Sequence, residues 1–121
     1  MIYSASYSDL RLYKDAVSVS LFPPTWRMPI YKELAPTFKI QNWWDSFTTE
    51  QKKDEKIQSI YVRLYLRDVL NRLDPEKVAK DLDGKTIVSE EKNGEFSHRL
   101  IVERWLIKHG FECKEVDIND A

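Results

Sequence analysis

The chain has 121 residues, of which 42% are hydrophobic and 32% are charged, and its formal net charge is -1 at pH 7. This length predicts a single domain over residues 1–121 with a real hydrophobic core, and the balanced charge does not favour nucleic acid as the partner. Cys113 is the only cysteine, which excludes a disulfide framework and a cysteine-rich zinc site.

No membrane or targeting segment is predicted. No apolar run approaches the roughly 18 residues of a membrane span, and the start, MIYSASYSD, lacks the basic and apolar regions of a signal peptide. We therefore expect a cytoplasmic protein with no membrane partner. The two histidines, His98 and His109, lie about three turns apart on one predicted helix, too far to share a metal. We expect no metal and no cofactor.

Two strands are predicted near the start of the chain, at Ile2–Ser6 and Ala16–Phe22. The second alternates aliphatic residues with serines, which is the period of a strand. Pro23-Pro24 ends it, because proline cannot donate a hydrogen bond to the ladder. Two more strands are expected at Lys85–Ser89 and Phe111–Ile118, and the mixed polarity of the last is typical of an edge strand.

An aromatic-rich insertion punctuated by prolines, residues 25–45, follows the second strand. Within it, Pro29–Ala35 predicts a short helix with proline in its first turn. Trp26, Trp43 and Trp44 either pack on the core or form a wall for a flat ligand. We favour packing, because large apolar side chains are mostly buried.

Three helices are predicted after the insertion. The capping-box sequence Thr48-Thr49-Glu50-Gln51 opens a long helix, Thr49–Leu73, with an apolar stripe. Asp74-Pro75 opens the next helix, Pro75–Leu82, as N-cap and N1. The last helix begins near Ser97 and ends at Gly110. Because strands and helices alternate, we predict an α/β domain of two or three layers with a mostly parallel sheet.

Tyr61 and Tyr65 lie one turn apart on the long predicted helix. Either both belong to the core with their hydroxyls at its rim, or both direct their hydroxyls into a ligand cleft. We favour the core, and we keep both as candidate ligand-binding residues.

The strongest candidate site lies between the third strand and the last helix, because open α/β proteins bind ligands where a strand passes into a helix. A helix N-terminus is a ready anion site, and here Ser97 would cap it. Arg99 could bind phosphate through two parallel hydrogen bonds, and His98 could exchange a proton near neutral pH. Glu91 lies within reach at the strand end. Alternatively, these residues only cap the helix and pair with neighbouring carboxylates.

The stretches IYSASYSDL, VSVSLFPPTW, YKELAP, YVRLYLRDVLNRLDPEKVAKDL and IVSEEKNGEFSHRLIVERWLIKHGFECKEV cover most of the chain. In this order they resemble the family labelled domain of unknown function 488, in its short bacterial and phage form. Its members typically carry a strand ending in Leu-Cys-Tyr-Glu, a loop ending in Phe-Cys-His-Arg, and a helix with a tryptophan.

The matching positions here are Ile87-Val88-Ser89-Glu90-Glu91, Phe96-Ser97-His98-Arg99 and Trp105. Both family cysteines are therefore serine, Ser89 and Ser97, and a thiol mechanism is lost because serine has no thiolate. The resemblance implies an α/β domain with its site at this loop. It supplies no established activity, although family members are suspected of acting on nucleotides or nucleic acids.

Three functions remain open. The first is binding of a phosphorylated, nucleotide-like ligand, as in a phage or defence-related sequestering protein. His98, Arg99 and the helix N-terminus at Ser97 would hold the phosphate, Tyr61, Tyr65 or Trp26 would stack on the base, and Ser89 and Glu91 are further ligand-binding candidates. The second is a hydrolase or transferase that acts on a nucleotide or nucleic acid, with His98 as general acid/base. The third is a protein-interaction module, a homodimer included, that uses the Trp26–Trp44 region.

Overall fold

The computed structural model describes residues 1–8, 15–23, 28–92 and 94–116. In these ranges the sheet has four strands, which are β1 (Ile2–Ser6), β2 (Ala16–Ser18), β3 (Thr86–Ser89) and β4 (Cys113–Glu115). They are hydrogen-bonded in the order β2-β3-β1-β4, and every pair is parallel. The predicted α/β class is confirmed, and β4 is an edge strand as expected.

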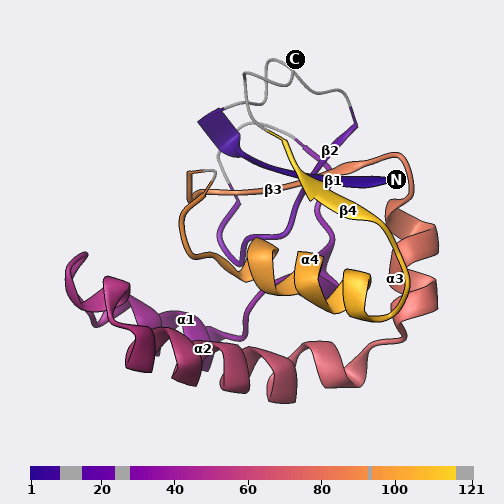
Figure 1. The fold of residues 1–121 in the computed structure, drawn as a ribbon. Coiled ribbons are helices and arrows are strands. Elements are labelled where there is room, and N and C mark those ends of the chain that lie inside the picture. The colour runs from indigo at the N-terminus through magenta and orange to yellow at the C-terminus, as the bar shows by residue number, and fades with distance from the viewer. Residues whose placement is uncertain (9–14, 24–27, 93, 117–121) are drawn as a thin grey trace.

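The helices of the described ranges are α1 (Phe38–Asp45), α2 (Glu55–Asp68), α3 (Pro75–Leu82) and α4 (His98–Lys108), with 3₁₀ turns η2 (Lys32–Leu34), η3 (Gln51–Lys53) and η4 (Leu70–Arg72). Figure 1 shows these helices on one side of the sheet. The connections from β2 to β3 and from β3 to β4 both advance across the sheet in the same direction. Crossovers of one hand that advance in one direction place their helices on the same face.

The core lies between this face of the sheet and the helices. Ile2 and Ile87 project into it from β1 and β3, Val19 lies directly after β2, and Val102 and Leu106 project from α4. All five are at most 2% exposed, and burying a side chain of this size contributes roughly 1.5–3 kcal/mol. Side chains alternate along a strand, so serines further along β1 and β3 point toward α4 as well.

The predicted long helix Thr49–Leu73 is wrong in its extent, since the segment divides into η3, α2 and η4. The capping box itself is confirmed, because Gln51 N–H donates to Thr48 Oγ1 and Thr48 N–H donates to Gln51 Oε1. The turn stops at Asp54, whose backbone is extended. Asp54 Oδ1 accepts from Lys56 N–H at 2.8 Å, which starts α2 anew.

The insertion also differs from prediction. Pro29–Ala35 holds a single 3₁₀ turn rather than a helix, and the unpredicted α1 follows it. Thr37 caps α1 by accepting from Ile40 N–H at 3.2 Å. Trp43 and Trp44 on α1 are half-buried and pack against the core, whereas Trp26 lies outside the described residues.

Candidate functional site

The loop from β3 to α4 ends at Ser97, which is extended and buried. Ser97 Oγ accepts from Leu100 N–H at 3.3 Å, so the predicted N-cap is confirmed. Its hydroxyl satisfies one of the helix's unpaired first-turn donors, and α4 therefore begins at His98.

Arg99 is fully buried, at 0% exposure, and its guanidinium connects three strands. Nε donates to Ser89 Oγ at 2.6 Å, and Nη1 donates to Ser4 Oγ at 2.9 Å. Nη2 donates to the Glu91 carbonyl oxygen at 2.6 Å, and Nη1 lies 3.6 Å from Glu115 Oε2. The guanidinium is thus directed at atoms of the protein itself, and a phosphate would have to replace these partners to reach it.

Ser89 links Arg99 to a carboxylate. Its hydroxyl accepts from Arg99 Nε and donates to Glu91 Oε2 at 2.7 Å. Ser89 is completely buried and Glu91 is partly exposed. The hydroxyl therefore connects the buried Arg99 guanidinium to the Glu91 side chain, which reaches the surface.

His98 is buried, and its ring contacts Val19 and Tyr65. Nε2 is 2.8 Å from the carbonyl oxygen of Val19, and because a carbonyl only accepts, Nε2 carries the proton. Burial lowers the pKa of His98, while the nearby Glu91 carboxylate acts in the opposite direction. At neutral pH the ring is therefore neutral and Nδ1 is its unprotonated nitrogen.

The two candidate tyrosines belong to the core. Tyr61 is 3% exposed and Tyr65 is 0% exposed, and burial raises the pKa of both phenols. The Tyr65 hydroxyl donates to the Leu34 carbonyl oxygen at 2.6 Å, and its ring lies 5.8 Å from that of His98. The structure places both rings behind the candidate site, and contact of either with a ligand stays a prediction.

An open cleft of about 390 Å³ lies beside the loop, at the carboxyl end of β3. Its lining comes from α1, from the η3 region with the start of α2, and from the loop; the residues are Gln41, Trp44, Asp45, Thr49, Lys52, Lys53, Gln58, Glu90, Glu91, Glu95 and Phe96. Of the predicted site residues, Glu91 alone is in this lining. Trp26 lies outside the described residues.

Trp44 and Phe96 supply the apolar wall of the cleft. Their ring centroids are 5.5 Å apart, and both rings contact Tyr61, at 5.0 and 5.6 Å. The wall is therefore braced from behind by a buried aromatic ring. The sequence indicated Trp44 only as one of the tryptophans of the insertion, and nothing local indicated that Phe96 would contact it.

Carboxylates dominate the charge of the cleft, since four acidic side chains face two lysines in the lining. Burial raises the pKa of Glu90, the neighbouring carboxylates of Glu91 and Asp45 raise it further, and Lys52 opposes them. A carboxyl group with a raised pKa in a cleft is typical of functional sites.

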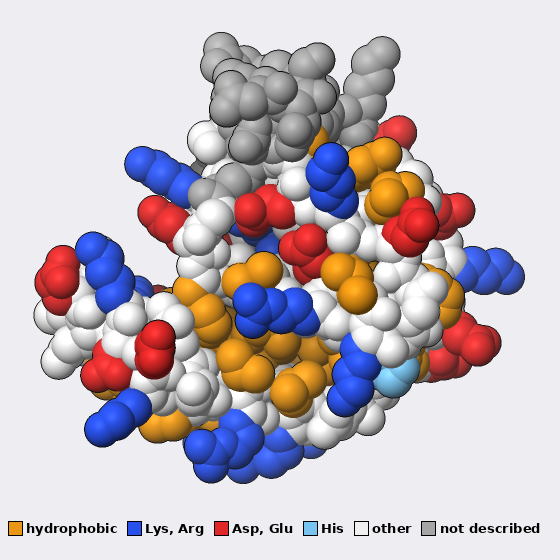
Figure 2. Space-filling model, in the orientation of Figure 1, with side chains coloured by type: hydrophobic (Ala, Val, Ile, Leu, Met, Phe, Trp, Pro, Cys, Tyr) orange, Lys and Arg blue, Asp and Glu red, His pale blue; other side chains and the backbone are white. Residues whose placement is uncertain are grey.

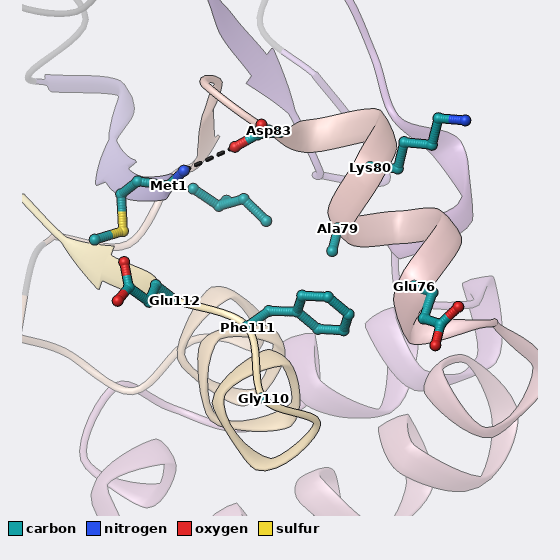
Figure 3. Close-up of a pocket in the computed structure, with 9 residues that line it drawn as sticks. Met1, Glu76, Ala79, Lys80, Asp83, Gly110, Phe111 and Glu112 are labelled. Atoms are coloured by element: carbon teal, nitrogen blue, oxygen red, sulfur yellow. Dashed lines mark hydrogen bonds and ion pairs between the residues drawn. The ribbon is translucent and has the colours of Figure 1, made fainter.

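Two other hollows lie away from the loop. The one in Figure 3, about 380 Å³, lies between α3 and the segment before β4, with Ala79 and Phe111 in its lining. It is at the amino end of the sheet, opposite the edge that binds ligands in open α/β folds. The second, about 320 Å³, lies between α2 and α4, where Figure 2 shows hydrophobic side chains bordered by basic ones. We therefore place the candidate site in the cleft beside the loop.

No protein-family model, curated protein or solved structure matches the chain. The resemblance drawn from the sequence therefore stays a prediction. Within the described ranges, no helix is long and apolar enough to cross a membrane. In the same ranges no group of three or more His, Cys, Asp or Glu side chains is placed to hold a metal ion.

Proposed function

We propose that the protein is a binding module for a small, flat ligand of the nucleoside class, held in the cleft beside the loop. The observation that carries this proposal is the Trp44–Phe96 wall at the carboxyl end of a parallel sheet. Stacking on aromatic side chains contributes about 1–3 kcal/mol per base. A cleft of about 390 Å³ has room for such a ligand and falls within the usual range of ligand pockets.

The polar part of the lining suits a nucleoside as well. Gln41 and Gln58 carry amide groups that donate and accept, and Thr49 carries a hydroxyl. Carboxylates accept from ribose hydroxyls and from exocyclic amino groups, and Glu91 is held in position for this by Ser89. Stacking on the face of the base and hydrogen bonds to its edge and to the ribose can therefore act together in one cleft.

The charges of the cleft favour an unphosphorylated ligand over the phosphorylated one predicted from the sequence. A phosphate would face the carboxylates of the lining, and the Arg99 donors are directed at Ser4, Ser89 and Glu91. Phosphate binding at Ser97 and Arg99, and a role in sequestering a phage or defence signal, stay predictions.

The test is a calorimetric titration with the four common nucleosides, their monophosphates, cyclic nucleotides and NAD derivatives. We expect a nucleoside to bind better than its monophosphate and to lose at least about tenfold in affinity in Trp44→Leu, because the stacking surface is gone. Trp43→Leu is the matched control, since Trp43 precedes Trp44 on α1 but does not line the cleft. If no ligand of the panel binds, or if Trp44→Leu binds as the wild type does, the proposal is wrong.

A second candidate is an enzyme acting on the same class of ligand, and the observation that favours it is the raised pKa of Glu90 in the cleft. The sequence predicted His98 as the general acid/base, but His98 is buried and does not line the cleft. Chromatography of nucleosides and nucleotides incubated with the protein decides the question. Turnover that disappears in Glu90→Gln supports catalysis in the cleft, and turnover that disappears only in His98→Gln supports the residue predicted from sequence.

A further inference from the structure

Lys52 places a positive charge on the aromatic wall of the cleft. Its Nζ lies 5.4 Å from the centroid of the Trp44 ring and 4.0 Å from Asp45 Oδ1. An ammonium within about 6 Å of an indole face is attracted by the negative face of the ring. The position that a ligand's cation would take on Trp44 is therefore occupied by a side chain of the protein.

The cleft still has more negative than positive charge. Of its two lysines, Lys53 pairs with Glu50 at 3.3 Å, and Glu50 is not part of the lining. One ammonium, that of Lys52, is thus left to balance four carboxylates, those of Asp45, Glu90, Glu91 and Glu95. A second positive charge inside the cleft would reduce the repulsion among these groups.

We infer that the ligand of this cleft carries a positive charge on its flat ring, and that Lys52 occupies the place of this charge until the ligand binds. The inference rests on the proposed function and names the class of ligand more closely, a cationic nucleoside. The ring of such a ligand stacks on Trp44, and its charge lies among the carboxylates.

Lys52 can leave Trp44 without disturbing the turn that carries it. Its backbone N–H donates to the Thr48 carbonyl oxygen at 3.0 Å, and its own carbonyl oxygen accepts from Gln58 Nε2 at 2.9 Å. The backbone is therefore anchored on both sides, while the ammonium is held by the ring and by one long ion pair of 4.0 Å. A long lysine side chain can exchange these contacts for water at a small cost.

The experiment compares 1-methyladenosine, which is protonated at pH 7, with its neutral isomer N6-methyladenosine and with adenosine, by calorimetry on the full chain. We expect 1-methyladenosine to bind about tenfold more tightly than either neutral nucleoside, from a cation–π contact and nearby carboxylates. In Lys52→Met, which keeps an apolar stem over Trp44, its affinity should rise by about five- to tenfold. Lys56→Met removes an exposed ammonium outside the lining and should leave the affinity unchanged.

The outcomes separate the two proposals. If the three nucleosides bind equally well, the charge inference is wrong while nucleoside binding stands. If affinity for 1-methyladenosine stays the same or falls in Lys52→Met, Lys52 does not occupy the place of the ligand's charge. If none of the three binds, the proposed nucleoside function is wrong and the inference falls with it.

Discussion

The buried guanidinium of Arg99 predicts a large loss of stability when it is removed. In Arg99→Met the apolar stem is kept, but Ser4 Oγ, Ser89 Oγ and the Glu91 carbonyl oxygen lose a charged donor at 2.6–2.9 Å. Breaking a buried ion pair from one side typically costs about 3–5 kcal/mol. Glu115, the carboxylate left behind, is 25% exposed and can be rehydrated, so we expect the lower end, about 3 kcal/mol.

A loss of this size lowers the ratio of folded to unfolded protein about 150-fold. Urea unfolding followed by tryptophan fluorescence measures it, and with a slope of about 2 kcal/mol per molar urea the midpoint should fall by about 1.5 M. Arg104→Met, on the exposed side of the same helix, is the control and should change stability by less than about 0.5 kcal/mol. A loss below about 1 kcal/mol in Arg99→Met would refute this reasoning. The contacts of the guanidinium would then be weak, and in the wild type it could leave them to bind a phosphate.

Three further changes follow from buried groups. Because burial lowers the pKa of His98, the unfolded chain binds a proton on this side chain more readily than the folded protein does. The free energy of unfolding should therefore fall as the pH drops below about 6.5. In urea unfolding at pH 5–8, His98→Gln should weaken this pH dependence, and the control His109→Gln should keep it. Tyr65→Phe leaves the buried Leu34 carbonyl without its donor and should cost about 1–3 kcal/mol by the same method, against almost no change in the exposed Tyr3→Phe. Burial raises the pKa of Cys113 to about 12, so a thiol-specific disulfide reagent at pH 8 should label it only in denaturant, and rapid labelling of the native protein would contradict its burial.

The parts of the fold that were predictable from sequence have local signals at both ends. Asp74 and Pro75 start α3 and the Asp83-Gly84 turn follows it, so the prediction Pro75–Leu82 matches the helix exactly. Asp74 Oδ1 accepts from Glu76 N–H at 3.0 Å, as an N-cap should. Residue Gly110 has a φ of +90°, the left-handed geometry predicted for the end of α4.

Helix α1 was missed because its start signal, Thr37, is hidden by the proline before it. The predicted helix Pro29–Ala35 stops before Pro36, whereas Thr37, the residue after this proline, caps a new helix. The predicted helix Thr49–Leu73 was too long because its sequence shows no clear break in helix propensity. Charged residues with good helix propensity continue through η3 and α2, and only the capping geometry of Asp54 separates the two.

The position of the loop in the fold was predictable, but the contacts around it were not. The loop joins β3 to α4 at the carboxyl end of the strands, as the sequence predicted. The partners of Arg99 depend on strand register, however, since Ser4 is 95 positions away along the chain. The cleft likewise combines α1, the η3 region and the loop, three segments that no local pattern connects.

The serine at position 89 connects Arg99 to the cleft through two hydrogen bonds. An oxygen can accept from Arg99 Nε at 2.6 Å and donate to Glu91 Oε2 at 2.7 Å at once, while a thiol is a weak donor and a weak acceptor. Arg99 is therefore connected to the cleft indirectly, because Ser89 hydrogen-bonds both the guanidinium and the carboxylate of Glu91, which lines the cleft. On this geometry the guanidinium that the sequence assigned to anion binding is hydrogen-bonded within the protein, and through Ser89 it positions Glu91, one of the carboxylates that we propose face the positive charge of the ligand.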